Sequence, residues 1–349
     1  MTTSVDYPTS YVMRYMGSKL RLLDFIVPIL EAMLPQGEGF LDLMAGTHAV
    51  GYALKPNHPI VANDIQEYSR VIGLSRIVND SFSPSRTDIQ KDIFDRLMPR
   101  PKFHLFEELY KDTYFSVGQC RDIDQIRGAI SQCRSPIRRA VYLTALIYAM
   151  GYCQSSPGHF AQYMPKDHPR LKSLRQLSIR EAFEKKLLEN HLVFSDYDNQ
   201  VFAVDYRRLL TAANYRKALT DVKLVYIDPP YSEAQYSRFY HLLETVVKYD
   251  YPEVSHKGLY RGDRFQSNFG YKAKAPEEFD FIAATCSKLG MNLALSYSDR
   301  GLVPIDTLLE IARRYYQDVT LHTQQYRHSM QGRGVLKDLH EVLITARND

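Results

Sequence analysis

Four consecutive residues, Asp228-Pro229-Pro230-Tyr231, carry groups suited to holding an amino group. They follow the apolar run 222–227, which predicts a short buried strand that the two prolines then end. The loop would bring a carboxylate, a proline carbonyl and an aromatic ring together at the end of a sheet. Two acceptors and a stacking ring suit the exocyclic amino group of a base. The alternative is a structural Asp-Pro-Pro turn.

A second stretch predicts a cofactor site. Residues 40–44 form an apolar strand pattern, and residues 46–51 (GTHAVG) nearly reproduce the glycine-rich turn of dinucleotide-binding sheets. His48 stands where that turn has its middle glycine, which lets the backbone approach a pyrophosphate. The histidine therefore argues against NAD or FAD and favours S-adenosyl-L-methionine, which has no pyrophosphate.

Acidic residues occur at or just after the ends of four predicted strands, namely Asp42, Asp64, Asp205 and Asp228. Ligands bind at the carboxyl ends of parallel strands, so we expect these acids to border one site. Asp64 is placed for ribose hydroxyls and Asp205 for the adenine of the cofactor, with a helix cap as the alternative for each. Asp42 would hold a loop or meet an ammonium group.

The order of predicted elements favours a doubly wound α/β sheet with an inserted, mainly helical domain. A helix is predicted at 20–34, and strands are predicted at 40–44, 60–62, 201–204, 224–227, 291–297, 319–323 and 341–345. Helical periodicity without a strand runs from about 68 to 189. We therefore predict a catalytic domain at 1–67 and 200–349, with the helical domain at 68–199 between them.

The bulk composition is that of a globular protein. The chain has 349 residues, 45% of them hydrophobic and 24% charged, and a formal net charge of +4. Its 4 cysteines lack metal-ligand spacing, so we expect no metal and a reducing, cytoplasmic setting. Residues 1–10 lack a signal leader, and the apolar run at 140–152 is too short to span a membrane.

Basic residues gather in two stretches. Residues 166–186 contain seven Lys or Arg against three acids, and residues 257–274 contain five against one. Either stretch suits contacts with phosphates or forms a solvated face.

Taken in order, these motifs resemble the N6-adenine-specific DNA methyltransferases of the Dam-like class, and most of all the FokI-type modification methylases. The matching segments are RYMGSK at 14–19, FLDLMAGTHAVG at 40–51, ANDIQEYS at 62–69, Asp205 and DPPY at 228–231. Gln235-Tyr236, YHLLET at 240–245 and Ser296-Tyr297 also match that subfamily. The resemblance covers most of the chain, and His48 departs from it.

The resemblance implies methyl transfer from S-adenosyl-L-methionine to N6 of an adenine flipped out of double-stranded DNA. Asp228, Pro229, Pro230 and Tyr231 would be catalytic: Asp228 and the Pro229 carbonyl accept the amino hydrogens, and Tyr231 stacks on the base. The implied cofactor-binding residues are Tyr15, Lys19, Asp42, Ala45, Gly46, Asp64 and Asp205. A core aromatic is the alternative for Tyr15, and a solvated lysine for Lys19.

The helical insertion is the predicted target-recognition region, with the loop 155–160 reaching into a groove. The predicted DNA contacts are His159, Arg170, Lys172, Arg175, Arg264 and Arg327. A packed interior histidine is the alternative for His159, as it is for His241.

The resemblance also implies a bacterial or phage-type setting and a partner restriction endonuclease, although an orphan methylase fits equally well; we expect a monomer. Two rival functions stay open: an RNA adenine methyltransferase, and a non-catalytic nucleic-acid-binding protein with a relic cofactor pocket. Asp228 disfavours methylation of a protein amide, for which Asn is usual at that position. His48 disfavours a nicotinamide oxidoreductase.

Overall fold

The structure is a computed structural model that describes residues 17–98, 104–189, 192–327 and 338–348. The chain forms two compact units, which we call the sheet unit and the helical unit. As far as the structure describes these ranges, the sheet unit comprises Lys19–Ser69, Ser195–Tyr236 and the segment from Phe265 onward, and the helical unit comprises Arg70–Phe194 and Ser237–Arg264.

Within the described residues, the sheet unit is built on one seven-stranded sheet with the order β3-β2-β1-β4-β7-β9-β8. Its strands are β1 (Gly39–Asp42), β2 (Ile60–Asp64), β3 (Gln200–Ala203), β4 (Val222–Ile227), β7 (Asn292–Ser298), β8 (Asp318–Arg327) and β9 (Asp338–Arg347). The first five in spatial order are parallel, and β9 is antiparallel to both β7 and β8. The predicted α/β class and all seven predicted strands are confirmed.

Alternation of side chains decides which residues lie under which helices. Leu41 pairs with Val61 on β2 and Val225 on β4, so their side chains share one face of the sheet. That face belongs to the main apolar core with Leu293 and Ile344. The opposite face carries Asp42, Tyr226 and, further along, Ser296 and Glu341. The two-residue period thus places polar side chains together on one face at the ends of the strands.

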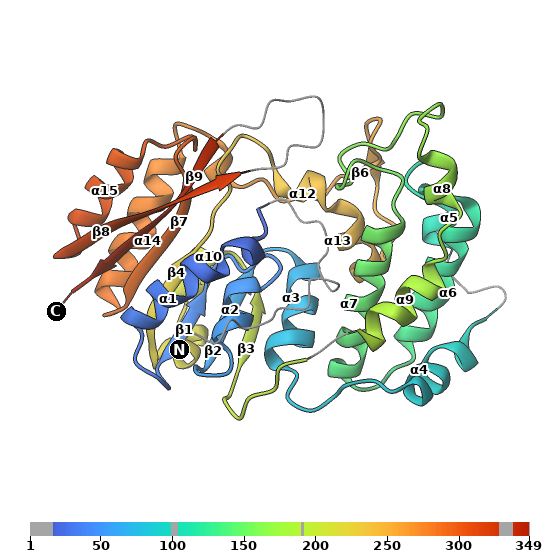
Figure 1. Cartoon of the computed structure of the whole chain (residues 1–349), viewed down its shortest axis with the longest axis horizontal. Coiled ribbons are helices and arrows are strands. Elements are labelled where there is room, and N and C mark those ends of the chain that lie inside the picture. The colour runs from blue at the N-terminus through green and yellow to red at the C-terminus, as the bar shows by residue number, and fades with distance from the viewer. Residues whose placement is uncertain (1–16, 99–103, 190–191, 328–337, 349) are drawn as a thin grey trace. The chain divides into compact units, whose positions relative to one another are not determined.

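Helices cover both faces of this sheet (Figure 1). The helices and 3-10 turns of the sheet unit are η2 (Lys19–Leu22), α1 (Leu23–Met33), α2 (Ala49–Leu54), α10 (Tyr206–Thr211), η5 (Ala213–Tyr215), α11 (Arg216–Leu219), η6 (Asn268–Gly270), α14 (Ala275–Lys288) and α15 (Ile305–Arg313). Helix α2 packs on β1, β2 and α1, whereas α14 packs on β7 and α15 on β8.

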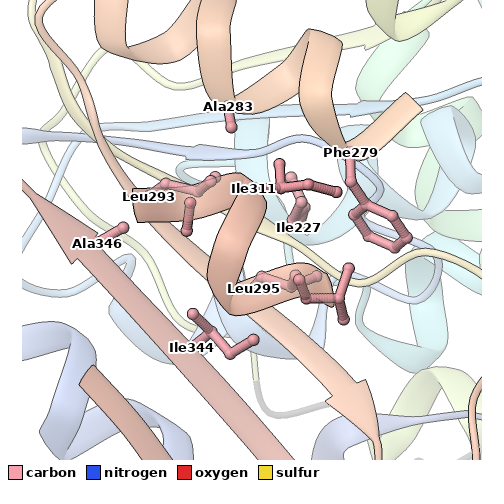
Figure 2. Close-up of a pocket in the computed structure, with 10 residues that line it drawn as sticks. Ile227, Phe279, Ala283, Leu293, Leu295, Ile311, Ile344 and Ala346 are labelled. Carbon is pink, nitrogen blue, oxygen red and sulfur yellow. The ribbon is translucent and has the colours of Figure 1, made fainter. Parts of the chain in front are cut away.

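A small cavity between α14, α15 and the sheet is lined by apolar side chains alone, among them Phe279, Leu295 and Ile344 (Figure 2). It offers no polar group to orient a ligand. We therefore assign it to the packed core rather than to a binding site.

The helical unit surrounds α7 (Pro136–Cys153), a helix that is buried along most of its length. Its other helices are η3 (Leu74–Val78), α4 (Arg86–Asp92), η4 (Phe94–Arg96), α5 (Leu105–Leu109), α6 (Val117–Ser131), α8 (Leu171–Arg175), α9 (Ile179–Leu188) and α13 (His241–Lys248). Helices α3 (Glu67–Gly73) and α12 (Tyr236–Phe239) lie where the chain passes between units, and β5 (Val254–Ser255) pairs with β6 (Tyr260–Arg261). Between β2 and β3 the described residues form helices, as predicted, together with one isolated bridge that was not predicted.

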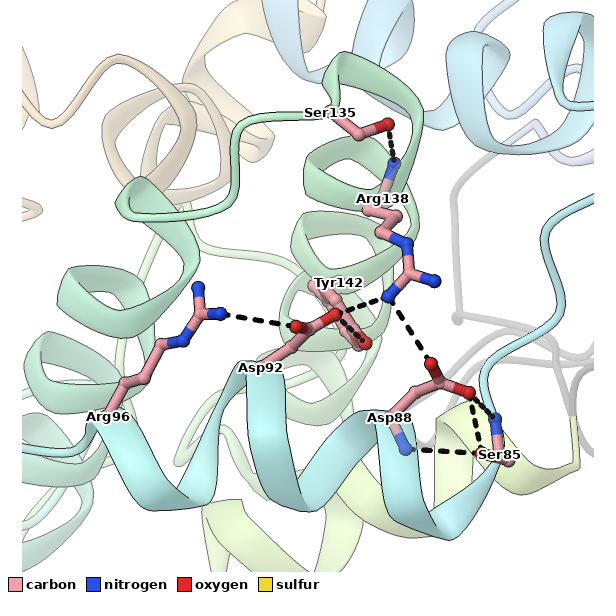
Figure 3. Close-up of polar contacts among 7 residues, drawn as sticks. All are labelled: Ser85, Asp88, Asp92, Arg96, Ser135, Arg138 and Tyr142. Atoms are coloured by element: carbon pink, nitrogen blue, oxygen red, sulfur yellow. Dashed lines mark hydrogen bonds and ion pairs between the residues drawn. The ribbon is translucent and has the colours of Figure 1, made fainter.

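A polar network joins α4 to α7 (Figure 3). The Arg138 guanidinium lies 2.8 Å from Asp92 and 3.3 Å from Asp88, and the Tyr142 hydroxyl donates to Asp92 at 3.0 Å. Ser85 caps α4 through a reciprocal capping box with Asp88. These contacts fix the register of the short amphipathic helix α4 on its neighbour.

The segment Ser237–Arg264 belongs to the helical unit, whereas the sequence alone placed it in the C-terminal catalytic part. The reason is the burial of α13, whose residues from His241 to Val247 are all buried. The carbonyl oxygens of Val246 and Val247 accept hydrogen bonds from Arg127 on α6 at 2.7 and 3.1 Å. Conversely, Asn199 belongs to the sheet unit, where its Oδ1 accepts the Ile60 amide at 2.8 Å.

A glycine is required at the start of β1. A Cβ on Gly39 would lie 2.6 Å from the carbonyl oxygen of Asp221 and 3.1 Å from Cα of Val222, both backbone atoms. We expect Gly39→Ala to lower the free energy of unfolding by about 1–3 kcal/mol, because the β1–β4 pair must separate. Urea denaturation measures this. The control is Gly118→Ala in α6, where a Cβ meets nothing within 4 Å, and an equal loss in both variants would contradict the steric explanation.

No helix in the described part of the chain is both long and apolar enough to cross a bilayer.

Candidate active site

The four predicted acids lie at the carboxyl ends of four neighbouring strands. Because the order there is β3-β2-β1-β4, they follow one another across the sheet as Asp205, Asp64, Asp42 and Asp228. The structure therefore brings together residues that are far apart in the sequence. Their local environments differ, and so do the tasks they can perform.

Asp64 holds the glycine turn. Its Oδ2 accepts the amide of Gly46 at 3.0 Å, and its Oδ1 accepts the amide of Gln66 at 2.9 Å. Gly46 has a φ of 51°, in the left-handed region that glycine tolerates best. Next to it, the Ala45 amide donates to the carbonyl oxygen of Asn63 at 2.8 Å. Asp64 thus orders the loop that the sequence assigned to the cofactor.

His48 takes the place of a glycine by turning its side chain into the protein. Its backbone is left-handed, with φ 61° and ψ 27°, at the N-cap of α2. The buried ring places Nε2 2.8 Å from the Ser69 carbonyl oxygen, and the Ser69 hydroxyl donates to Gly46 O at 2.7 Å. Histidine enters the left-handed region more readily than bulkier residues do. The histidine therefore anchors the turn.

Asp42 is a loop-holding residue. It is 2% exposed, and its Oδ2 accepts the amide of Gly51 at 3.2 Å. Burial first, and then the charges of Asp228 and Asp64, raise the pKa of Asp42 to about 8. A carboxyl that is mostly protonated at neutral pH is a poor partner for an ammonium group. Of the two roles predicted for Asp42, the geometry therefore favours the loop.

Asp205 caps α10, since its Oδ1 accepts the amide of Arg207 at 2.9 Å while the residue remains half-buried. Nearby, Glu278 accepts hydrogen bonds from Arg207 and from the Asn268 amide group. Burial, followed by the charge of Asp205, raises the pKa of Glu278. The cap predicted as the alternative for Asp205 is present, and its carboxylate still borders the strand ends.

Asp228, which is half-buried, belongs to a polar cluster with half-buried Tyr231 and with three buried residues, Lys19, Ser296 and Glu341. Lys19 Nζ lies 2.9 Å from Asp228 Oδ1 and 3.2 Å from Glu341 Oε1, and it contacts the Tyr231 hydroxyl at 2.5 Å. The Tyr231 hydroxyl is 2.7 Å from each of the same two carboxylate oxygens. Ser296 donates to Glu341 at 2.7 Å. Lys19 is therefore a buried partner of two carboxylates rather than a solvated helix-start lysine.

The charges in this cluster shift one another's protonation. Burial opposes the charged form of Lys19, but the carboxylates of Asp228 and Glu341 raise the pKa of Lys19 above its ordinary value. Burial raises the pKa of Asp228, the charge of Lys19 opposes this, and the charge of Glu341 adds to it. The pKa of Tyr231 is raised by burial and then by both carboxylates. The phenol therefore stays protonated and can donate.

Tyr231 is turned into this cluster. Its ring meets Tyr297 at 4.9 Å between centroids and at 64°, and Lys19 Nζ lies 4.8 Å from the ring centre. In this arrangement the hydroxyl supports Asp228, a role that the sequence did not predict. Stacking of the ring on a base stays a prediction.

Glu341 and Ser296 complete the site, and only Ser296 had a signal in the motifs. Glu341 opens the apolar stretch 341–345. A charged residue at the head of a strand is usually taken as an edge residue, so sequence reasoning missed it. Applying the two-residue alternation to β7 and β9 would have placed both side chains on one face.

The predicted DNA contacts lie in contrasting environments. Arg170 and Lys172 are exposed, whereas Arg175 donates to the carbonyl oxygen of Asp112 at 2.8 Å and is partly enclosed. His159 packs on Phe239 at 4.9 Å between centroids, and burial lowers the pKa of the imidazole.

The other histidine is an interior residue. His241 is fully buried with Nε2 2.9 Å from the Phe160 carbonyl oxygen, and burial lowers the pKa of His241 to about 3. Two of the predicted residues cannot be placed: Tyr15 and the side chain of Arg327 lie outside what the structure describes.

Among the described residues, no group of three or more His, Cys, Asp or Glu has an arrangement suited to a metal ion.

A doubly wound, mostly parallel sheet with this row of acids at its strand ends defines the fold class of the S-adenosylmethionine-dependent methyltransferases. Within that class, the family model described as D12 class N6 adenine-specific DNA methyltransferase matches residues 15–288. The chain belongs to this family.

Curated relatives agree with the family. The chain is 30% identical to modification methylase LlaI of Lactococcus lactis subsp. lactis, covering 95% of this chain and 54% of the relative. It is 26% identical to type II methyltransferase M.FokI of Planomicrobium okeanokoites, covering 97% and 53%. It is also 26% identical to M.NlaIII of Neisseria lactamica, covering 90% and 92%. The chain thus spans about half the length of the first two relatives and most of the third.

Proposed function

We propose that this chain transfers the methyl group of S-adenosyl-L-methionine to N6 of an adenine in double-stranded DNA. The observation that carries the proposal is the environment of Asp228: a carboxylate at the end of β4, directly before the Pro229 carbonyl, with Oδ1 fixed by Lys19 and Tyr231. Family membership supports the same reaction.

The residues at the strand ends fit this cofactor. The half-buried carboxylates of Asp64 and Asp205 are acceptors for ribose hydroxyls and for the adenine amino group. Gly46 lacks a side chain and leaves its backbone open to close approach, with Ala45 beside it. Lys19 stands at the start of η2, next to Asp228. When bound, S-adenosyl-L-methionine supplies an electrophilic methyl group on a cationic sulfur.

The chain's own contribution is orientation and charge. An adenine amino group is a weak nucleophile because its lone pair is delocalised into the ring. Asp228 and the Pro229 carbonyl would accept its two hydrogens and direct the lone pair at the methyl carbon. Methyl transfer would form the new C–N bond as the C–S bond breaks, and the amino nitrogen would then pass one of its protons to water. The negative charge of Asp228 stabilises the positive charge that develops on the nitrogen.

Radiolabelled S-adenosyl-L-methionine tests this function. The protein is incubated separately with duplex DNA and with structured RNA, and the nucleosides are then separated. Label in N6-methyladenine from DNA is the expected result. Label in N6-methyladenine from RNA alone would show that the substrate is RNA and not DNA. Cofactor binding without label on either nucleic acid would favour a non-catalytic nucleic-acid-binding protein.

The helical unit is the proposed target-recognition region. Arg238 is exposed, and its charge, after burial, lowers the pKa values of both His159 and Arg264. Arg238 and Arg264 form no ion pair with a carboxylate in the described part of the chain. Cations held near one another without acids suit a phosphate backbone. We therefore add Arg238 to the predicted contacts His159 and Arg264.

Arg170 and Lys172 provide a test of DNA binding. Both are exposed and neither forms an ion pair within the described residues. We expect the double substitution to alanine to weaken DNA binding and to flatten the plot of log affinity against log salt by about 1 for each phosphate that is no longer neutralised. Fluorescence anisotropy at several salt concentrations measures this.

Two comparisons make that test specific. Lys223→Ala, on β4, removes an exposed charge from the sheet unit and should leave the salt slope unchanged. Cofactor affinity should also be unchanged, and a parallel loss of cofactor binding would indicate misfolding. Arg175→Ala is a poor probe because Arg175 supports the backbone at Asp112.

We further propose that the chain acts as a monomer in the cytoplasm and protects DNA from a partner restriction endonuclease. The names of its relatives, as modification methylases and type II methyltransferases, support this setting.

A further inference from the structure

Glu341 lies at the centre of the hydrogen-bond network around Asp228. It is 8% exposed, on β9, 110 residues from Tyr231 in the sequence. A single oxygen, Oε1, accepts the Ser296 hydroxyl at 2.7 Å and lies 3.2 Å from the Lys19 ammonium. The Tyr231 hydroxyl is 2.7 Å from this oxygen and 2.7 Å from Asp228 Oδ1, so the two carboxylates share its one hydrogen. Burying a carboxylate costs free energy unless it is paired, and here the hydroxyl of Ser296, the ammonium group of Lys19 and the shared hydrogen of Tyr231 compensate for that cost. Both Ser296 and Glu341 lie beyond the segment matched by the family model, which ends at residue 288.

The pairing of β7 with β9 explains why these side chains meet. Ser296 is opposite Leu343, and Ser298 is opposite Glu341, in an antiparallel ladder. Ser296 and Glu341 are therefore diagonal neighbours on one face, within reach of a side-chain hydrogen bond. The insertion of β9 beside β7 brings the carboxylate to the end of β4.

The contacts of Asp228 are one-sided. Within the described residues, its hydrogen bond from Tyr231 and its ion pair with Lys19 both use Oδ1. The other oxygen, Oδ2, is left for a further donor. Glu341 contacts the same two partners as Asp228 Oδ1, namely Lys19 and Tyr231. It therefore helps to fix the Oδ1 side of the Asp228 carboxylate, which is the side away from the proposed substrate.

We propose that Glu341 is a positioning residue for methyl transfer: through Lys19 and Tyr231 it orients Asp228 so that Oδ2 faces the amino group of the base. This inference rests on the proposed function. Glu341 also sets the net charge of the cluster. Lys19 balances only one of the two carboxylates, so the cluster keeps one negative charge when both are ionised. That charge favours the positive charge that develops on the amino nitrogen.

The pH dependence separates this role from a structural one. Among the described residues, the titratable groups facing the cluster are Lys19, Asp228, Glu341, Asp42, Tyr226, Tyr231 and Tyr236. The charge of Glu341 raises the pKa of both Asp228 and Lys19. Removing that charge should therefore lower the pKa of Asp228, and the acid limit of the rate should move to lower pH.

The test is Glu341→Gln in the full chain. We expect kcat to fall by about 100-fold, which is the cost of misplacing a reacting group by a small distance. The KM for S-adenosyl-L-methionine and the melting temperature should be unchanged, and the acid limb of the pH profile should move to lower pH. Glu310→Gln, an exposed glutamate on α15, is the matched control and should match the unsubstituted protein. A kcat within twofold of the unsubstituted value, with the same pH profile, would overturn the proposal.

A second measurement does not depend on catalysis. Carboxyl ¹³C resonances of labelled aspartate, with Asp228 assigned by comparison with Asp228→Asn, should titrate at lower pH in Glu341→Gln. An unmoved Asp228 titration overturns the inference even if activity is lost. If the unsubstituted protein methylates no DNA, the proposed function fails, while the shift still establishes that Glu341 acts on Asp228. If Glu341→Gln folds poorly, Ser296→Ala is the second variant, because it removes one donor to Glu341. It should change kcat and the pH profile in the same direction but by less. An unchanged pH profile in Ser296→Ala counts against the proposal.

Discussion

Asp228→Ala is expected to lower the rate of methyl transfer by about 10²–10³ or more while cofactor affinity stays the same. The side chain supplies the charged acceptor at the end of β4, and the neighbouring Pro229 carbonyl cannot replace both the acceptor and the charge. Asp64 and the Gly46 turn, which are proposed to bind the cofactor, keep their own hydrogen bonds in this variant. Single-turnover transfer of labelled methyl to DNA, together with calorimetry of S-adenosyl-L-methionine binding, measures the two effects separately.

Two further variants sharpen this experiment. Asp228→Asn keeps the shape and one acceptor oxygen but removes the charge, so its rate should lie between that of Asp228→Ala and that of the unsubstituted protein. Asp221→Ala removes an exposed aspartate just before the other end of the same strand and should leave the rate unchanged. Full turnover by Asp228→Ala would refute the catalytic role of this residue.

The sheet could be predicted because its strands are short apolar runs bounded by turn residues. Residues 40–44, 60–62 and 224–227 have this pattern, and the structure has strands there. The position of the acids followed from one rule, since parallel strands place their carboxyl ends at one edge. Asp64 and Asp228 needed no tertiary information to be found.

The parts that escaped prediction depend on contacts between distant segments. Strands β8 and β9 have similar patterns, and nothing local says that the last strand, rather than β8, pairs with β7. Glu341 reaches Lys19 only because of that order. Likewise, α13 joins the helical unit because its buried residues need an apolar environment, which the sequence of the segment does not locate.

His48 shows how a departure from a motif can be accommodated. The sequence reveals that a glycine is missing from the turn. The structure shows that the backbone at His48 is still left-handed and that the imidazole ring is within hydrogen-bond distance of the Ser69 carbonyl oxygen. The direction of the His48 side chain decides whether the missing glycine disrupts the turn. Hydrophobic periodicity in the sequence carries no information about that direction.

Lys19→Met is expected to lower the free energy of unfolding by about 3–5 kcal/mol near pH 8, because it leaves the half-buried Asp228 and the buried Glu341 without their cation. The charge of Lys19 lowers the pKa of Asp228, so in the variant this pKa should rise further above its ordinary value. Between the ordinary pKa and the raised pKa, the folded state then binds a proton that the unfolded state releases, and the free energy of unfolding falls as pH rises through this range. The loss should be smaller at pH 5 than at pH 8, as urea denaturation at the two values would measure.

A double variant identifies the cause of that loss. Lys19→Met with Glu341→Gln leaves one uncompensated carboxylate instead of two, so it should be more stable near pH 8 than Lys19→Met alone. Lys223→Met, an exposed lysine on β4, is the matched control and should stay within about 0.5 kcal/mol of the unsubstituted protein. If the second substitution makes Lys19→Met less stable, the loss comes from packing around the lysine stem and not from charge. The buried cation would then be a structural residue, and the charge balance proposed for the cluster would fail with it.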